Sequence, residues 1–395
     1  MRSLLLAVAL GLAAAASAQV LDVRAVNTSG HPAQAIWTPD GKHVLVTITR
    51  NNPLESGIEI FRVEGTKLKH AAWQPLGSEP AQDIVLIPNT GLLAVGISNA
   101  GVVFLSLDAT LEGKADPHVL GQGDHPGSSF LAVTPRGDTL FVANQTLHGG
   151  SVGIIAIRRS PKGQPVPQAI AQLPTPSSPA GIILSPNGTR LYAVDQFLPA
   201  KELRDRLPGH DTPELQHGDC FETPGSTPNL NGGLFVIDVT RASAPPTDYS
   251  AQHDRDATIT QINAGCGPVR EAVSSDGRTV YVSARDDDAI LVFDAAALEH
   301  DPAHAFLRTF TTNGITPVGL ALFDHDSKLL VANSYRYSVA PGNATVVDLT
   351  NPTAPKFLQT IKTGNFPRDI TVSPDGRSML LTVYLEDQLM LLTMK

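Results

Sequence analysis

One unit of sequence recurs seven times along the chain, and this repeat constrains the fold more than any other feature. Each copy has a proline, an apolar segment, a turn that in most copies is of the Ser-Pro-Asp-Gly kind, and a second apolar segment. The copies begin at Pro32, Pro80, Pro126, Pro179, Pro268, Pro317 and Pro367. The intervals between these leading prolines are 48, 46, 53, 89, 49 and 50 residues. A regular internal period indicates one repeated supersecondary unit rather than several independent domains.

The length of the period predicts a particular architecture. A repeat of about 50 residues is too long for leucine-rich, ankyrin or tetratricopeptide units and fits a four-stranded propeller blade. Asn-Gly at 187–188 and Asp-Gly at 375–376 each separate two apolar segments, which indicates a hairpin because glycine adopts the positive φ that such turns need. A third apolar segment follows the second in each copy. We therefore predict an all-β fold, a seven-bladed β-propeller of four-stranded antiparallel blades.

The two ends of the chain complement each other in this scheme. The last copy stops after its third apolar segment, 388–392, so its blade lacks an outer strand. Residues 21–26 precede the first copy and belong to none. We predict that this N-terminal strand completes the last blade, which closes the ring and covers a sheet edge that would otherwise be open.

The first residues have the pattern of an export signal. Arg2 precedes an apolar run at 4–15, and Ala-Ser-Ala at 16–18 is a small-x-small cleavage site. Such an apolar core is too short to span a bilayer and is typical of a signal peptide. We expect residues 1–18 to be removed, leaving 19–395 as a single propeller that is secreted or periplasmic.

Composition and missing motifs exclude several classes of function. The net charge is −9, whereas a general nucleic-acid binder needs a basic face. The rest of the chain has no run of 18 apolar residues, so we expect no membrane insertion. The sequence has no phosphate-binding loop, no His-Glu-x-x-His and no Cys-x-x-Cys-His motif. We predict a monomer without a metal or cofactor, whose partner is a small molecule or a protein.

The 89-residue interval carries an insertion. It is roughly 40 residues longer than the repeat period, and the excess, 197–231, falls between the second and third strands of its blade. This connection should lie on the same face as the leading prolines, over the mouth of the central channel, and long loops of this kind are functional or disordered. Cys220 and Cys266 would share that face. In an exported protein this arrangement favours a disulfide over free thiols.

The copies resemble a known repeat family. The segments 185–194, 275–284 and 373–377 are similar to the YVTN-type propeller repeat, and Phe-Val-Ala-Asn at 141–144 and Leu-Val-Ala-Asn at 330–333 correspond to its closing motif. The resemblance implies a lactonase-like, seven-bladed propeller. This family includes exported binding proteins of unknown ligand, and its relatives include 6-phosphogluconolactonase and muconate-cyclising enzymes. Because one fold hosts both kinds of protein, function depends on the site.

Polar residues just after the leading prolines are the candidates for that site, because these positions should line the channel mouth. They are Gln82, Asp83, Arg270, Glu271, Arg368 and Asp369, with Arg285 at the end of a second strand. Arginine can hold a carboxylate through two parallel hydrogen bonds, so this set suits an anionic or polyhydroxylated ligand. The same Arg–acid pairs are equally compatible with structural ion pairs between blades.

Two functions stay open. The first is an exported binding or interaction propeller, which the lack of a recognisable catalytic constellation favours. The second is a lactonase-like hydrolase acting on a sugar-acid or similar lactone. In that mechanism Arg270 or Arg368 holds the substrate, and His125 or Glu271 activates water as a general base. His31 also precedes a leading proline and is a further candidate for ligand binding or proton transfer.

Overall fold

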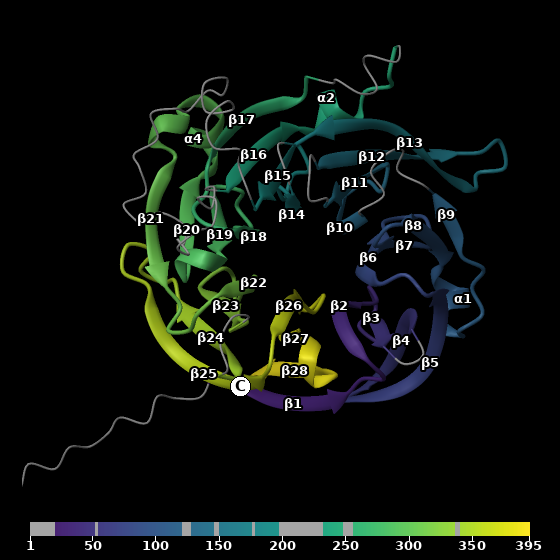
Figure 1. Cartoon of the computed structure of the whole chain (residues 1–395), viewed down its shortest axis with the longest axis horizontal. Coiled ribbons are helices and arrows are strands. Elements are labelled where there is room, and N and C mark those ends of the chain that lie inside the picture. The colour runs from purple at the N-terminus through teal and green to yellow at the C-terminus, as the bar shows by residue number, and fades with distance from the viewer. Residues whose placement is uncertain are drawn as a thin grey trace, which may run out of the picture.

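A ring of seven blades is the architecture of the chain. The computed structural model describes residues 20–51, 54–120, 128–145, 150–175, 178–196, 232–247, 256–335 and 340–395. In these residues, strands β1 to β28 form seven four-stranded sheets around one axis (Figure 1). The prediction of an all-β, seven-bladed propeller is confirmed. The predicted signal peptide, 1–18, and the insertion, 197–231, lie outside the described residues.

Each blade contains four antiparallel strands, named below from the axis outward. Blade 1 contains β2 (His31–Trp37), β3 (His43–Asn51), β4 (Leu54–Glu64) and β5 (Lys67–Gly77). Blade 2 contains β6 (Ala81–Ile87), β7 (Leu92–Ile97), β8 (Gly101–Ser106) and β9 (His118–Leu120). Blade 3 contains β10 (Ser128–Val133), β11 (Thr139–Asn144), β12 (Ser151–Arg159) and β13 (Pro165–Pro174). Blade 4 contains β14 (Pro179–Leu184), β15 (Arg190–Asp195), β16 (Gly233–Asp238) and β17 (Thr258–Asn263).

The remaining three blades follow the same order. Blade 5 contains β18 (Pro268–Val273), β19 (Thr279–Ala284), β20 (Ala289–Asp294) and β21 (Phe306–Thr311). Blade 6 contains β22 (Pro317–Phe323), β23 (Lys328–Asn333), β24 (Gly342–Asp348) and β25 (Lys356–Gly364). Blade 7 contains β26 (Pro367–Val372), β27 (Ser378–Val383), β28 (Gln388–Met394) and, outermost, β1 (Leu21–Asn27).

Short helices join some of these strands. The α-helices α1 (Leu107–Leu111), α2 (Val239–Ser243) and α4 (Ala295–His300) each follow the third strand of a blade. Three short 3-10 helices are η2 (Arg285–Asp287), η3 (Pro302–His304) and η4 (Tyr384–Glu386). Within the described residues, no helix has the length and apolar character that crossing a membrane requires.

The recurring Ser-Pro-Asp-Gly turn folds through its own side chains. In blade 7, Ser373 Oγ donates to Asp375 Oδ1 at 2.6 Å and accepts from the Ser378 N–H at 2.9 Å, while Gly376 has a φ of +71°. Ser and Asp favour such turns because their side chains replace backbone partners, and glycine tolerates the positive φ. In blades 1, 4 and 5 the hydroxyl of the first turn residue likewise donates to the Asp or Asn two residues later. The residues that define the repeat are therefore those that turn the first strand into the second.

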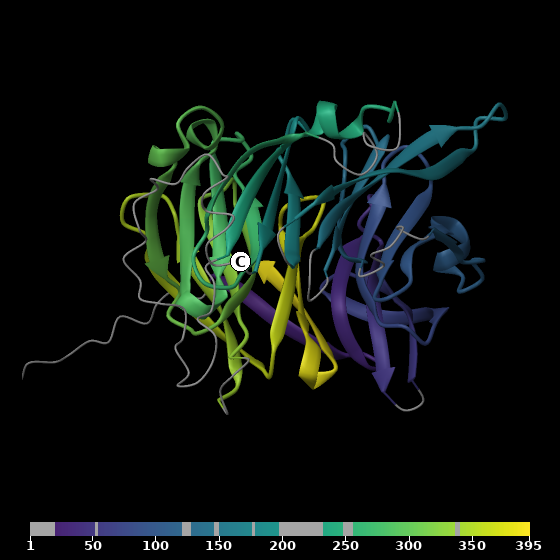
Figure 2. The same ribbon diagram turned by 45° about the horizontal axis from the view of Figure 1, so that its top comes forward.

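Each blade begins and ends on the same face of the ring, because it contains four antiparallel strands. All inner strands therefore start on one face, which we call the proline face after the leading prolines. The turns between first and second strands lie on the opposite face, the hairpin face. Figure 2 shows the strands running between these two faces. The innermost strands surround the axis (Figure 1) and are β2, β6, β10, β14, β18, β22 and β26.

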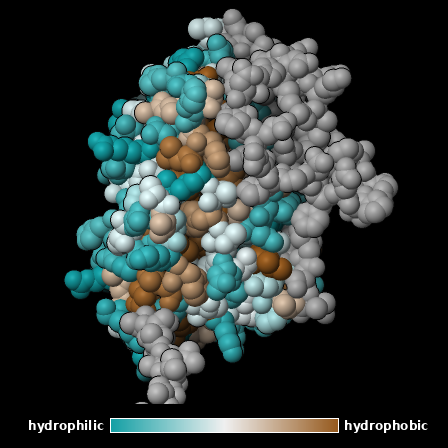
Figure 3. Space-filling model, turned by 90° about the vertical axis from the view of Figure 1, so that its left-hand side faces the viewer, coloured by the Kyte–Doolittle hydropathy of each residue, from teal (hydrophilic) through white to brown (hydrophobic). Residues whose placement is uncertain are grey.

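The hydrophobic core is divided among the junctions between blades. Phe141 and Ile154 of blade 3, for example, pack with Leu191 and Phe235 of blade 4. Seven clusters of this kind occupy the seven junctions. Because both faces of a blade are covered, its middle strands are apolar almost throughout. On the outside, Figure 3 shows hydrophobic residues scattered among hydrophilic ones.

The N-terminal strand closes the ring, as predicted. Strand β1 pairs antiparallel with β28 from Leu21↔Met394 to Asn27↔Gln388, and the Lys395 N–H donates to the Val20 carbonyl at 3.3 Å. The start of β1 is also held by blade 6. Gln359 Oε1 accepts the N–H groups of Val20 and Leu21 at 2.8 and 3.0 Å. Closure therefore joins the first and last strands of the propeller to each other and to a neighbouring blade.

A β-bulge interrupts the pairing of the first and second strands near the start of every inner strand. In blade 5 the register shifts between Pro268 and Arg270, and in blade 7 between Pro367 and Ile370. The other five blades have the same feature. A bulge re-aims the side chains beside it. The residues that follow the leading prolines are consequently not placed by simple strand alternation.

Candidate functional site

Side chains from four blades meet at the axis, near the proline face. We define the axial cluster as Gln82 and Asp83 of β6, Phe130 of β10, Arg270 of β18, and Arg368 and Asp369 of β26. Five of these six residues are among the predicted site residues, and the structure brings those five together. Phe130 is the addition.

Arg270 lies across the channel and touches four blades. Its Nε lies 3.4 Å from Asp369 Oδ1 in blade 7, and its Nη1 donates to the carbonyls of Ala180 in blade 4 and Val269 in its own blade, both at 2.7 Å. Its guanidinium carbon lies 3.7 Å from the centre of the Phe130 ring in blade 3. A guanidinium stacked on an aromatic face gains a cation–π interaction. These contacts make Arg270 a brace between blades.

Asp83 is the most deeply buried acid of the axial cluster, at 5% exposure. Its Oδ1 accepts the Ile84 N–H and its Oδ2 accepts the Leu131 N–H of blade 3, both at 2.7 Å. Burial, with the nearby Asp369 charge, raises the pKa of Asp83 to about 7, although these hydrogen bonds oppose the shift. Burial also raises the pKa of Asp369, and the charges of Arg270 and Arg368 oppose that rise. Because Asp83 is only partly ionised at neutral pH, the carboxyls do not fully balance the two arginines.

Arg368 is held differently from Arg270. Its Nη2 donates to Gln82 Oε1 at 2.7 Å, and its guanidinium carbon lies 5.2 Å from the centre of the Tyr384 ring. Among the described residues, no carboxylate lies within ion-pair distance of it. Burial and the charge of Arg270 lower the pKa of Arg368 to about 10, so it stays protonated at neutral pH. Arg368 is thus a half-buried cation whose remaining N–H groups are available to a ligand.

Glu271 and Arg285 are not part of the axial cluster. Glu271 is 6% exposed and accepts a hydrogen bond from the Val194 N–H, which places its carboxyl between blades 4 and 5. Its Oε1 has no hydrogen-bond partner among the described residues, and burial raises its pKa to about 8. Arg285, in η2, pairs with the adjacent Asp286 at 3.0 Å. Glu271 therefore projects into the junction between blades 4 and 5, and the ligand-binding roles predicted for Glu271 and Arg285 stay predictions.

His31 links blade 1 to blade 7. Its Nδ1 lies 2.9 Å from the Tyr384 carbonyl and 2.7 Å from Asp387 Oδ1, and its Nε2 lies 2.6 Å from Asn51 Nδ2. The imidazole also stacks on the Tyr384 ring, with 4.9 Å between ring centres. Both ring nitrogens are engaged, so His31 is better suited to holding Tyr384 beside Arg368 than to proton transfer.

The remaining predicted site residues lie partly outside the described residues. His125 and Cys220 lie outside the described residues, so their roles stay predictions. Cys266 is 2% exposed and precedes β18 on the proline face, where its N–H donates to Asp287 Oδ2 at 2.8 Å. In the described part of the chain, no group of three or more His, Cys, Asp or Glu side chains could hold a metal ion.

Phe130 and Tyr384 are two residues near the axis that the sequence did not predict as site residues. Phe130 reads as one more apolar residue of an inner strand, and only the bulge between Ser128 and Phe130 distinguishes its position. Tyr384 directly follows β27, at the same end of the second strand where Arg285 follows β19. A search for aromatic side chains at these strand ends would have found Tyr384.

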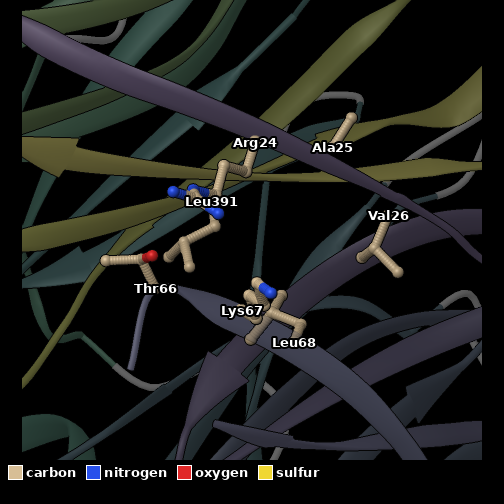
Figure 4. A pocket seen from close by; sticks show the side chains of 7 residues that line it. All are labelled: Arg24, Ala25, Val26, Thr66, Lys67, Leu68 and Leu391. Carbon is tan, nitrogen blue, oxygen red and sulfur yellow. The ribbon is translucent and has the colours of Figure 1, made fainter. Parts of the chain in front are cut away.

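A groove of about 430 Å³ lies at the outer rim, between blades 7 and 1 (Figure 4). Arg24, Ala25 and Val26 of β1 form one side, Thr66, Lys67 and Leu68 the other, and Leu391 of β28 also lines it. The two cations are exposed, so solvent screens their charges. None of these seven lining residues has a buried polar side-chain atom without a partner, and we assign the groove no ligand.

Comparisons with known proteins support the fold of this chain and do not identify its family or function. No protein-family model matches the chain, and no curated protein matches it. Among solved structures, a chain in the "Crystal Structure of Mitotic Checkpoint Complex" is similar, with a TM-score of 0.61 and 12% sequence identity. The match covers 99% of this chain and 98% of that chain. At this identity the similarity supports a β-propeller of the same size. The resemblance to YVTN-type and lactonase-like repeats stays a prediction.

Proposed function

We propose that this protein is an exported binding propeller that takes a small carboxylate-bearing ligand at the mouth of its channel. One observation carries the proposal: Arg368 is a half-buried guanidinium with an amide partner and no ion pair among the described residues. Such a group is costly to keep without a counter-charge. A ligand carboxylate can accept two parallel hydrogen bonds from it.

The surroundings of Arg368 support a planar anionic ligand. Tyr384 offers an aromatic face on one side, and Gln82 orients the guanidinium on another. The pKa of Asp83, raised to about 7, leaves this carboxyl only partly ionised at neutral pH, so it balances the positive charge of the axial cluster incompletely. Arg270, by contrast, already uses its Nε on Asp369 and its Nη1 on two carbonyls. Arg368 is therefore the ligand contact and Arg270 supports the site.

Binding of a panel of sugar acids and other small carboxylates tests this proposal. We expect at least one to bind wild-type protein in a calorimetric titration, and Arg368→Gln to weaken it by at least about tenfold, since a charged hydrogen bond contributes about 1.5–3 kcal/mol. Arg136→Gln is the matched control, because Arg136 is 84% exposed and pairs locally with Asp138. Equal binding by wild-type protein and Arg368→Gln would exclude this site.

Export is a separate part of the proposal. It is supported by the charged start, apolar run and Ala-Ser-Ala cleavage pattern within residues 1–18. N-terminal sequencing of the protein recovered from outside the cytoplasm should begin at Gln19. Recovery of the full-length chain from the cytoplasm alone would contradict export.

A lactonase-like hydrolase is the second candidate, on one observation. Asp83 and Glu271 are buried carboxyls with pKa values raised to about 7 and about 8, a range that suits proton transfer at neutral pH. Their placement favours binding instead. Both oxygens of Asp83 accept backbone N–H groups, and Glu271 lies between two blades. Turnover of a sugar-acid lactone, lost in Arg368→Gln and retained in Arg136→Gln, would favour the hydrolase.

A further inference from the structure

The hairpin face carries a second hollow, far from the axial cluster along the strands. It has a volume of about 280 Å³ and lies between blades 4 and 5. The turn before β15 and the turn before β19 form two sides, and the start of α4 forms a third. We call it the hairpin pocket and define it by Asn187, Arg190, Tyr192, Ser275, Asp276 and Glu299.

Tyr192 brings a hydroxyl to this pocket. The side chain as a whole is 2% exposed, and among the described residues nothing hydrogen-bonds to its hydroxyl. The hydroxyl oxygen is not one of the fully buried polar atoms that lack a partner in the described chain, so it keeps access to the pocket. A hydroxyl with such access can bond to water or to a ligand. Phe141 occupies the equivalent position of β11 and is fully buried there. The fold therefore needs the ring and has no need of the hydroxyl.

The pocket presents donors and acceptors together. The Tyr192 hydroxyl stays a donor, because burial and the Glu299 charge raise its pKa to about 12. Asn187 uses its Oδ1 within its own turn, which leaves its NH₂ group for a ligand. One carboxylate oxygen of Glu299 lies 2.7 Å from Arg190 Nη2, and the other can accept a hydrogen bond from a ligand. Each hydroxyl of a polyhydroxylated ligand can donate and accept, and so matches such a set.

The charges around the pocket disfavour an anion. Arg190 is the single cation among the lining residues, and it is held by Glu299 at 2.7 Å and Asp238 at 3.6 Å. Asp276 adds a further carboxylate at the rim. The surplus of negative charge repels carboxylates and phosphates. The volume lies just below the usual range of ligand pockets, about 300–1,000 Å³, so only a small ligand fits.

We propose that the hairpin pocket binds a neutral saccharide of one or two rings. The Tyr192 hydroxyl donates to a sugar oxygen, and Glu299 accepts from a sugar hydroxyl. This site is independent of the carboxylate site at the channel mouth, because it lies on the opposite face and has the opposite charge balance.

A matched pair of tyrosine variants tests the proposal. Tyr281 occupies the equivalent position in blade 5, is 6% exposed, and likewise has no hydrogen bond to its hydroxyl in the described chain, but it does not line the pocket. Tyr192→Phe and Tyr281→Phe therefore remove the same group from similar surroundings. Binding of glucose, galactose, mannose and maltose is followed by saturation-transfer NMR and calorimetry on the full chain.

We expect one of these sugars to bind wild-type protein. Tyr192→Phe should weaken it by at least about fivefold, the loss of one hydrogen bond, while Tyr281→Phe and Arg368→Gln leave it unchanged. Unfolding of Tyr192→Phe without ligand should match wild-type protein, which shows that the variant folds. The proposal is overturned if none of the sugars binds, if the two tyrosine variants bind equally, or if Arg368→Gln abolishes binding.

Discussion

Arg270 and Glu271 are neighbours in sequence and have opposite surroundings in the fold. Arg270 projects to the axis, where it contacts a carboxylate, two carbonyls and an aromatic face. Glu271 projects sideways against Gly181 of blade 4, where a side chain at Gly181 would collide with its carboxyl. The bulge between Pro268 and Arg270 re-aims the side chains beside it. One residue therefore belongs to the channel and the other to a junction between blades.

The buried position of Glu271 predicts an unusual dependence of stability on pH. Its pKa is about 8 in the folded protein against 4.5 ordinarily, so between these values the folded state holds a proton that the unfolded chain has lost. Stability should therefore be fully present below about pH 4.5 and fall as pH rises toward 8, by about 1.4 kcal/mol per pH unit from this group. Glu271→Gln keeps the shape and should flatten the fall, as measured by urea unfolding at pH 5.5 and 8.

Glu112→Gln is the control for this measurement. Glu112 is exposed on the chain segment after α1, and its nearest partner is the exposed Lys114. Its replacement should leave the slope unchanged. If Glu271→Gln retains the wild-type slope, then Asp83 and Asp369, whose pKa values are also raised, must carry the effect.

At the scale of elements, the strand that closes the ring is held mainly from one side. Strand β1 pairs with β28 and is the outermost strand of its sheet. Its first residues depend on Gln359 of β25, whose Oε1 accepts two N–H groups and whose Nε2 donates to the Leu21 carbonyl at 3.3 Å. The Gln359 side chain therefore makes the hydrogen bonds to the β1 backbone that a neighbouring fifth strand would otherwise make.

Replacing Gln359 should loosen the closing strand selectively. Gln359→Ala leaves the N–H groups of Val20 and Leu21 without partners, and we expect it to reduce the free energy of unfolding by about 1–3 kcal/mol. Hydrogen exchange should quicken in residues 21–27 and stay unchanged in β13. Gln168→Ala is the control, since Gln168 makes one exposed bond to Arg158. Equal exchange rates in wild-type protein and Gln359→Ala would show that pairing with β28 suffices.

Strand order and closure were predictable from the sequence, whereas the direction of single side chains was not. A hairpin turn favours particular residues, so the copies that carry them, together with the regular spacing of the leading prolines, reveal seven blades. A β-bulge requires no particular residues. Its position near each leading proline nevertheless decides which residue faces the axis. For this reason the sequence could not separate Arg270, which reaches the axis, from Glu271, which does not. Phe130 was not predicted as a site residue because an apolar residue in an inner strand has the same sequence pattern as a residue of the hydrophobic core.

At the scale of the whole molecule, Arg270 connects blades that do not touch one another. Blades 3, 5 and 7 are separated around the ring, and its guanidinium contacts groups from each. Arg270→Met should remove these links and leave Asp369 without its ion pair. Breaking a buried pair in this way costs about 3–5 kcal/mol. Thermal and urea unfolding would measure the loss.

The matched control is Arg136→Met. Arg136 pairs with Asp138 at 2.7 Å within one exposed hairpin, so its replacement should change stability by less than about 0.5 kcal/mol. Equal stability of the two variants would mean that junctions between blades hold the ring without an axial brace.

Because β1 closes the ring, the position of the chain termini could be moved to another turn without changing the fold. Val20 and Lys395 meet through a hydrogen bond, so the first and last strands of the propeller end beside each other. Exposed turns such as the one at Gly163, between β12 and β13, are equivalent places for a cut. A circular permutant that starts there would contain the same blades, junctions and axial cluster. The only blade that records the order of the coding sequence is the one that combines strands from both ends, which is blade 7 in this chain and would be blade 3 in the permutant.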